Sequence, residues 1–115
     1  MDISEVLSSK DRLIDTVITI EGVFVLEYET GYFVQSEEHY RDKTDAIMVE
    51  YPGLTKLLWS TVPAYGGSSY SYCHEAVITG TIKYSVDTNF PLAITAISKL
   101  TLYTRKMEFP VINSP

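Results

Sequence analysis

The chain has few of the residues on which catalytic, metal-binding and disulfide-stabilised proteins depend. Its 115 residues include one cysteine, two histidines and one tryptophan. A single cysteine forms no internal disulfide, which agrees with a reducing compartment. No stretch approaches the roughly 18 apolar residues that a membrane helix needs, and the N-terminus lacks the basic and apolar regions of a secretory signal. We therefore expect a cytoplasmic protein with no membrane span.

The few candidate catalytic residues do not form a recognisable site. Cys73 and His74 are adjacent, and neighbours on a strand point to opposite faces, so they would not converge on one zinc ion. Glu37, Glu38 and His39 have the residue types for acid–base chemistry but fall in a charged loop with no predicted pocket. The sequence thus predicts no catalytic residue, no metal site and no cofactor. An enzyme acting through one of the two histidines is the least favoured of three hypotheses.

Bases are scarce in the first half of the chain. Residues 1–50 hold twelve acids and four bases, a net charge of −8, whereas residues 51–115 hold three acids and five bases, a net charge of +2. An acidic field repels phosphate backbones and attracts basic partners. The charge distribution therefore favours a protein partner with a basic surface over nucleic acid.

The residues that are present predict one packed domain spanning 1–115. The chain has the usual length of a single domain, 45% of it is hydrophobic, and no linker divides it. Residues 3–15 carry apolar side chains at helical spacing after Asp2, with Glu5 three residues later, which predicts a capped helical lead-in. The next residues, 17–28, are β-branched and aromatic with Gly22 in the middle, which predicts one long strand that bends at the glycine.

The rest of the chain predicts four more strands and one helix. Leu54, Leu57, Leu58 and Val62 form an apolar stripe at helical spacing, and Pro63 ends that helix. The later strands include a second one with a central glycine, Gly80. The predicted strands are 17–28, 32–36, 46–51, 73–85 and 92–104, with loops at 29–31, 37–45, 64–72 and 86–91 and an irregular tail at 107–115.

The order of these elements, and three segments in particular, resemble the OB-fold. Val17 to Val25 followed by Tyr32 to Gln35 is similar to the first hairpin of bacterial OB-like domains of the anticodon-binding type. Val77 to Ile82 and Ile94 to Ile97 are similar to their last two strands. The resemblance covers residues 17–104 and implies an all-β protein with short helices, built as a five-stranded Greek-key barrel with a helix between strands three and four. It also implies a ligand face on strands two and three, where OB-folds bind oligonucleotides or oligosaccharides.

Acids and tyrosines surround the face that the resemblance implies. Tyrosines in or beside loops are common recognition residues, although they also cover barrel edges with their hydroxyls in water. The acids expected there are Glu27, Glu29, Glu37, Glu38, Asp42, Asp45 and Glu50. The predicted binding residues are Tyr28, Tyr32, Glu37, Glu38, Tyr40, Tyr65, Tyr70 and Tyr72.

These observations favour a non-catalytic module that docks a basic protein, as an inhibitor, immunity-type protein or adaptor would. The alternative is an OB domain that binds single-stranded nucleic acid or oligosaccharide. For nucleic acid, that alternative would use residues 65–72 and a basic strip formed by Lys83, Lys99, Arg105 and Lys106. The sequence leaves the oligomeric state open.

Overall fold

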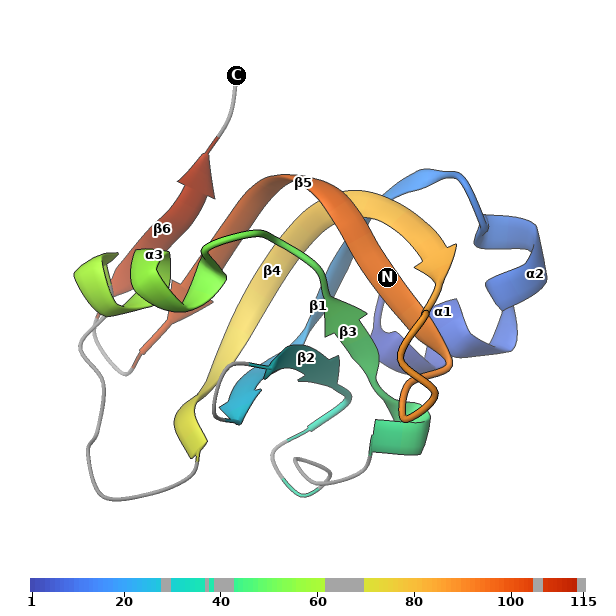
Figure 1. Ribbon diagram of the computed structural model, residues 1–115, viewed down its shortest axis with the longest axis horizontal. Helices are drawn as coiled ribbons and strands as arrows, with labels where there is room; N and C mark the ends of the chain where they lie inside the picture. The colour runs from blue at the N-terminus through green and yellow to red at the C-terminus, as the bar shows by residue number, and fades with distance from the viewer. Residues whose placement is uncertain (28–29, 37, 39–42, 62–69, 105–106, 114–115) are drawn as a thin grey trace.

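A computed structural model describes residues 1–27, 30–36, 38, 43–61, 70–104 and 107–113 (Figure 1). Strands dominate, and the helices are short. The elements in chain order are α1 (Ile3–Ser8), α2 (Lys10–Leu13), β1 (Val17–Glu27), β2 (Thr30–Val34), the 3₁₀ helix η2 (Lys43–Asp45), β3 (Ile47–Val49), α3 (Leu54–Thr61), β4 (Tyr70–Tyr84), β5 (Leu92–Tyr103) and β6 (Glu108–Asn113).

The first five strands close into a barrel. The sheet has the order β3-β2-β1-β4-β5-β6, and an additional parallel pairing of β3 with β5, from Ile47 opposite Leu92 to Val49 opposite Ile94, joins its two sides. The other pairings between these five strands are antiparallel. The helix α3 follows β3 and precedes β4. This connectivity confirms the predicted five-stranded OB-like barrel.

Two glycines lie where the pairing of the long strands changes. β1 pairs with β4 from Val17 onward but with β2 only from Val23, directly after Gly22. A Cβ on Gly80 would lie 2.7 Å from the carbonyl oxygen of Thr95, where the register between β4 and β5 shifts. A larger residue at such a close approach would force the neighbouring backbone to shift. The predicted bend at Gly22 thus marks the place where one strand begins to serve both sides of the barrel.

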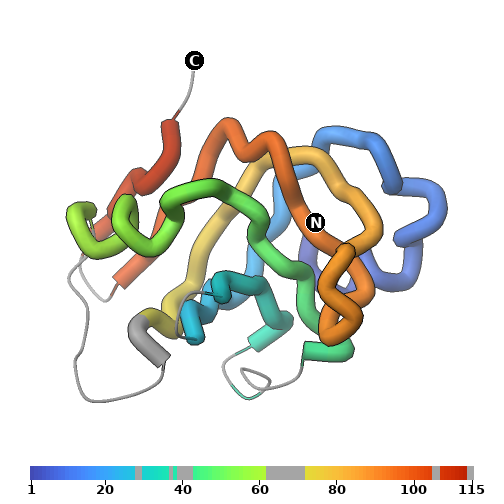
Figure 2. Tube along the Cα trace, in the orientation of Figure 1, coloured from blue at the N-terminus to red at the C-terminus, as the bar shows by residue number. Residues whose placement is uncertain are grey.

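The barrel interior is the main hydrophobic core. Phe24 and Phe33 are fully buried there, with ring centroids 5.7 Å apart. The N-terminal helices supply Ile3 and Val6 to the same core at one end of the molecule, and α3 supplies Leu58. Figure 2 shows α1 and α2 at one end and α3 beside β6 at the other. The helices α1 and α3 are thus held mainly by the apolar side chains that they bury.

The structure differs from the sequence prediction at both ends of the chain. The lead-in is two helices, and Asp2 with Glu5 forms the expected capping box on the first of them. The tail predicted to be irregular contains β6, because Val111 and Ile112 are buried in the main core. Pro110 lies in this strand although it lacks an N–H donor. A proline is tolerated here because β6 is at the edge of the sheet and pairs with a neighbouring strand on one side only.

Candidate functional site

The structure describes four of the eight predicted binding residues, Tyr32, Glu38, Tyr70 and Tyr72. Tyr28, Glu37, Tyr40 and Tyr65 lie outside the described residues. Glu38 is exposed, and Tyr70 is the first residue of β4. The loop-based surface expected from the sequence is therefore not represented in the described part of the chain.

The other two predicted binding residues, Tyr32 and Tyr72, are inaccessible in this conformation. Tyr72 is 1% exposed in the main core, and its ring centroid is 6.4 Å from that of His74. Burial raises the pKa of the Tyr72 hydroxyl because the phenolate loses solvation. Tyr32 is fully buried in a second apolar cluster. Both tyrosines pack in the folded protein, and neither offers a surface to a partner.

That second cluster closes the outer face of the first three strands. Side chains alternate along a strand, so β1 directs Phe24 into the barrel and Val23 and Val25 outward. The outward residues join Tyr32 and Val34 of β2, and Phe90, from the connection between β4 and β5, packs on them. The centroids of the Tyr32 and Phe90 rings are 5.4 Å apart. The face on which the OB-fold resemblance places a ligand is thus covered by the chain itself.

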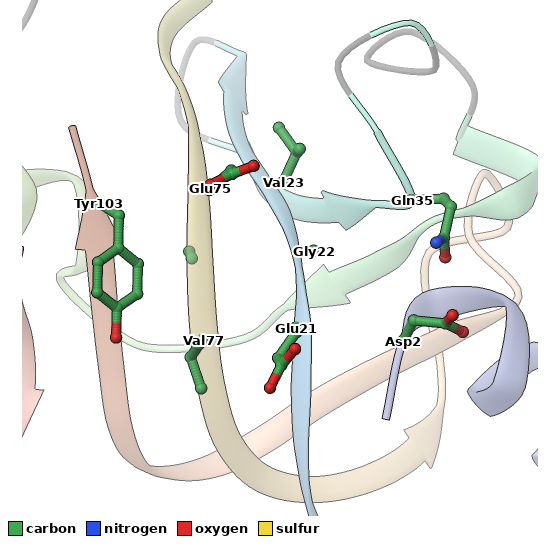
Figure 3. Close-up of a pocket in the computed structure, with 9 residues that line it drawn as sticks. Asp2, Glu21, Gly22, Val23, Gln35, Glu75, Val77 and Tyr103 are labelled. Atoms are coloured by element: carbon green, nitrogen blue, oxygen red, sulfur yellow. The ribbon is translucent and has the colours of Figure 1, made fainter. Parts of the chain in front are cut away.

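An open hollow lies on a different part of the barrel wall, around Gly22. Its volume is about 370 Å³, and it crosses β5, β4 and β1 to reach the N-terminal segment (Figure 3). Tyr103 of β5 lies at one side and is 38% exposed. The lining residues are Asp2, Glu21, Gly22, Val23, Gln35, Glu75, Ala76, Val77 and Tyr103.

Three carboxylates line this hollow, and strand register brings two of them together. Glu21 is opposite Val77, and Val23 is opposite Glu75, so the two glutamates are diagonal neighbours on the outward face. Diagonal neighbours in an antiparallel pair lie about 7–8 Å apart. Both glutamates are exposed. The two carboxylates therefore form a solvent-exposed cluster of negative charge.

The third carboxylate is positioned by pairing of the N-terminus with β1. The backbone N–H of Glu21 donates to the carbonyl of Met1 at 2.8 Å, and the N-terminal ammonium donates to the Thr19 carbonyl at 3.2 Å. Asp2 then begins α1, and its carboxylate accepts a bond from the Glu5 N–H at 2.8 Å. The same side chain therefore caps a helix and lines the hollow.

The lining residues that the structure describes include no base, and none of the described bases forms an ion pair with the carboxylates of the hollow. Lys43 pairs with Glu27 at 2.8 Å, and Lys83 pairs with Asp15. Lys83 and Lys99, from the predicted basic strip, are both exposed, whereas Arg105 and Lys106 lie outside the described residues. Negative charge in the hollow is thus left without a neighbouring base among the described side chains.

Within the described ranges, no three histidine, cysteine or acidic side chains are grouped closely enough to hold a metal ion. His39 lies outside these ranges, and His74 packs its ring against Tyr72. None of the described helices is both long enough and apolar enough to cross a membrane.

The chain matches no protein-family model, and no curated protein matches it either. The case for a function therefore depends on the geometry of the chain itself.

The sequence analysis missed the residues of the hollow because they are far apart along the chain. Asp2, Glu21, Glu75 and Tyr103 come from four segments, and only strand register brings them to one face. Alternation along β1 does predict that Glu21 points outward beside buried Ile20. That signal identifies one residue of the site but not its neighbours.

Proposed function

We propose that this protein is a non-catalytic interaction domain that docks a basic protein partner through the acidic hollow around Gly22. One observation carries the proposal: Asp2, Glu21 and Glu75 line one hollow, and its described lining residues include no base. Exposed charge of one sign on a concave surface raises the encounter rate with an oppositely charged partner. A small inhibitor, an immunity-type protein or an adaptor in the cytoplasm would use such a surface.

The other lining residues suit a protein ligand. Tyrosine is enriched in protein interfaces because it buries a large area while keeping a hydroxyl for hydrogen bonding. Tyr103 is the exposed aromatic residue of the hollow, and Val77 supplies an apolar surface beside Glu75. An arginine side chain fits this arrangement, since its planar guanidinium binds carboxylates in a bidentate manner and stacks on aromatic rings.

The proposal also includes a family assignment, which depends on the fold alone. Membership of the OB superfamily, with the bacterial domains of the anticodon-binding type as relatives, is the interpretation that the strand order supports. Single-stranded nucleic acid or oligosaccharide binding remains the alternative for such a fold. An acidic hollow disfavours the nucleic acid, because binding would bring phosphates close to carboxylates.

Two double variants with the same change in net charge test the proposal. Glu21→Gln with Glu75→Gln removes two charges from the hollow, whereas Asp15→Asn with Glu108→Gln removes two exposed charges that do not line it. The probe is a fluorescent arginine-rich peptide whose anisotropy is measured at low and high salt. We expect salt-sensitive binding that the first pair weakens about tenfold, or roughly 1.4 kcal/mol, and the second pair leaves almost unchanged.

Equal losses for the two double variants would mean that net charge alone attracts the peptide, which would reject the hollow as the site. A labelled single-stranded oligonucleotide is titrated in parallel. Oligonucleotide binding that is stronger than peptide binding would favour the alternative function.

A further inference from the structure

We infer that the connection between β4 and β5, residues 85–91, is an internal cap that occupies an aromatic-binding socket on the outer face of β1, β2 and β3. The inference concerns a neighbouring part of the same outer face, which shares Val23 with the acidic hollow, and it does not depend on the proposed function. Phe90 is the side chain that fills the socket. It is 5% exposed, and Tyr32 beneath it is fully buried.

The socket has the chemistry of an aromatic-ring site. Its fully buried walls are Val25, Tyr32, Val34 and Ala46, and the partly buried Met48 packs against them. None of the described residues that are buried in the protein is charged. Apolar walls around a ring-sized space accept an uncharged aromatic group, and a methionine adapts its shape to such a group.

The connection keeps its own shape through local hydrogen bonds. The Asn89 N–H donates to the Asp87 carboxylate at 2.9 Å, and the Phe90 N–H donates to the Asp87 carbonyl at 3.1 Å. The Ser85 hydroxyl accepts from the Asp87 N–H at 3.1 Å. All three bonds lie within the connection and do not use the barrel wall.

One aromatic ring joins the connection to the outer wall of the barrel. The Phe90 ring packs on Tyr32, and the Ser85 hydroxyl lies 3.9 Å from the Met48 sulfur. Val86, in the same connection, is 89% exposed. A pre-shaped segment that inserts one aromatic ring into the wall is suited to exchange that ring for one from outside. The external ligand that fits is an aromatic side chain presented by a partner protein.

Cys73, the sole cysteine, makes the exchange measurable. It lies opposite Val25 in the β1–β4 pairing and packs against the same cluster. Cys73 is half-buried, so an increase in its labelling rate above that of the wild-type protein reports opening of the socket. We would measure that rate in the full chain, in Phe90→Ala and in Val86→Ala, with and without indole as the aromatic probe.

We expect Phe90→Ala to raise the labelling rate about tenfold or more, because removing the ring lets solvent and reagent reach the cluster. Indole should then slow labelling of Phe90→Ala by refilling the socket, as apolar cavities accept small aromatic molecules. Val86→Ala should label at the wild-type rate, since its side chain is exposed in the same connection. Circular dichroism establishes that each variant is folded.

Two results would overturn the inference. One is an unchanged labelling rate in folded Phe90→Ala, and the other is a raised rate that indole does not lower. If Phe90→Ala does not fold, Phe90→Leu is measured in the same way. It retains much of the apolar volume, and it should label faster than wild type and be protected by indole. A Phe90→Leu protein that labels at the wild-type rate would also reject the cap.

Discussion

The backbone of Gly22 lies directly against the carbonyl group of Val34. A Cβ on Gly22 would be 2.8 Å from that oxygen and 3.1 Å from Cγ1 of Ile3. The strand wall and the N-terminal helix thus meet at a residue that has no side chain, and Gly22 also lines the acidic hollow.

Gly22→Ala should therefore lower the free energy of unfolding by about 1–3 kcal/mol, the usual cost of overpacking. Urea denaturation measures the change. Val17→Ala is the control, because Val17 is on the same strand but 69% exposed, and its replacement should change stability by less than about 0.5 kcal/mol. A Gly22→Ala protein as stable as wild type would contradict the close approach.

Ala96 has a backbone conformation that favours glycine. Its φ is 48°, and it lies in β5 where the pairing with β4 jumps from Thr79 opposite Lys99 to Thr81 opposite Thr95. Ala96→Gly should raise the free energy of unfolding by about 0.5–1 kcal/mol. Glycine relieves the backbone strain at this position, and the larger conformational entropy that it gives the unfolded chain offsets part of the gain. Ala93→Gly, at a buried extended position of the same strand, should lower it. Equal destabilisation by both changes would reject strain at Ala96.

The two roles of Asp2 can be separated. Asp2→Ala removes both the helix cap and the charge, and should cost about 1 kcal/mol of stability. Asp2→Asn keeps an oxygen that accepts from the Glu5 N–H, so stability should remain close to wild type. Binding of the arginine-rich peptide should weaken in both variants, because both remove one charge from the hollow. Full peptide binding by Asp2→Asn would exclude Asp2 from the site.

Tyr84 connects β4 to α2 in a way that responds to pH. Its hydroxyl donates to the Asp11 carboxylate at 2.5 Å, and this bond, followed by desolvation and the Asp11 charge, raises the pKa of Tyr84. A raised folded pKa means that the stabilisation is complete below the unfolded value of about 10 and is lost as pH rises through the folded pKa.

Asp11→Ala should consequently return the pKa of Tyr84 toward its ordinary value, as measured by an NMR titration with Tyr84→Phe used for assignment. The difference in stability between wild type and Asp11→Ala should be present at pH 8 and diminish at strongly alkaline pH. A Tyr84 pKa that Asp11→Ala leaves unchanged would contradict the bond.

Local sequence patterns predicted much of the barrel because each pattern corresponds to one element. The apolar stripe of Leu54 and Leu58 predicts α3, and both side chains are buried. Asp2 and Glu5 predict the capping box on α1. Gly22 and Gly80 lie in strands at the backbone contacts that need glycine. These features depend on neighbours in the chain, so the sequence alone contains the information.

The remaining features depend on contacts between distant segments. The position of Phe90 in a turn gives no indication that its ring covers Tyr32, because the contact requires the folded barrel. For the same reason, Tyr32 was predicted to bind a partner although it is buried. The apolar residues of β6 alternate poorly around Pro110, and only pairing with β5 makes this segment a strand.

The parallel pairing of β3 with β5 also has a consequence for how the chain folds. The hairpin of β1 and β2 forms between neighbours, but Val17 must find Thr81, and Ile47 must find Leu92, before the circuit of strands is complete. Chain entropy must be lost before these distant contacts form, so we expect folding in milliseconds to seconds. Closure of the barrel by the β3–β5 pairing should be among the last events.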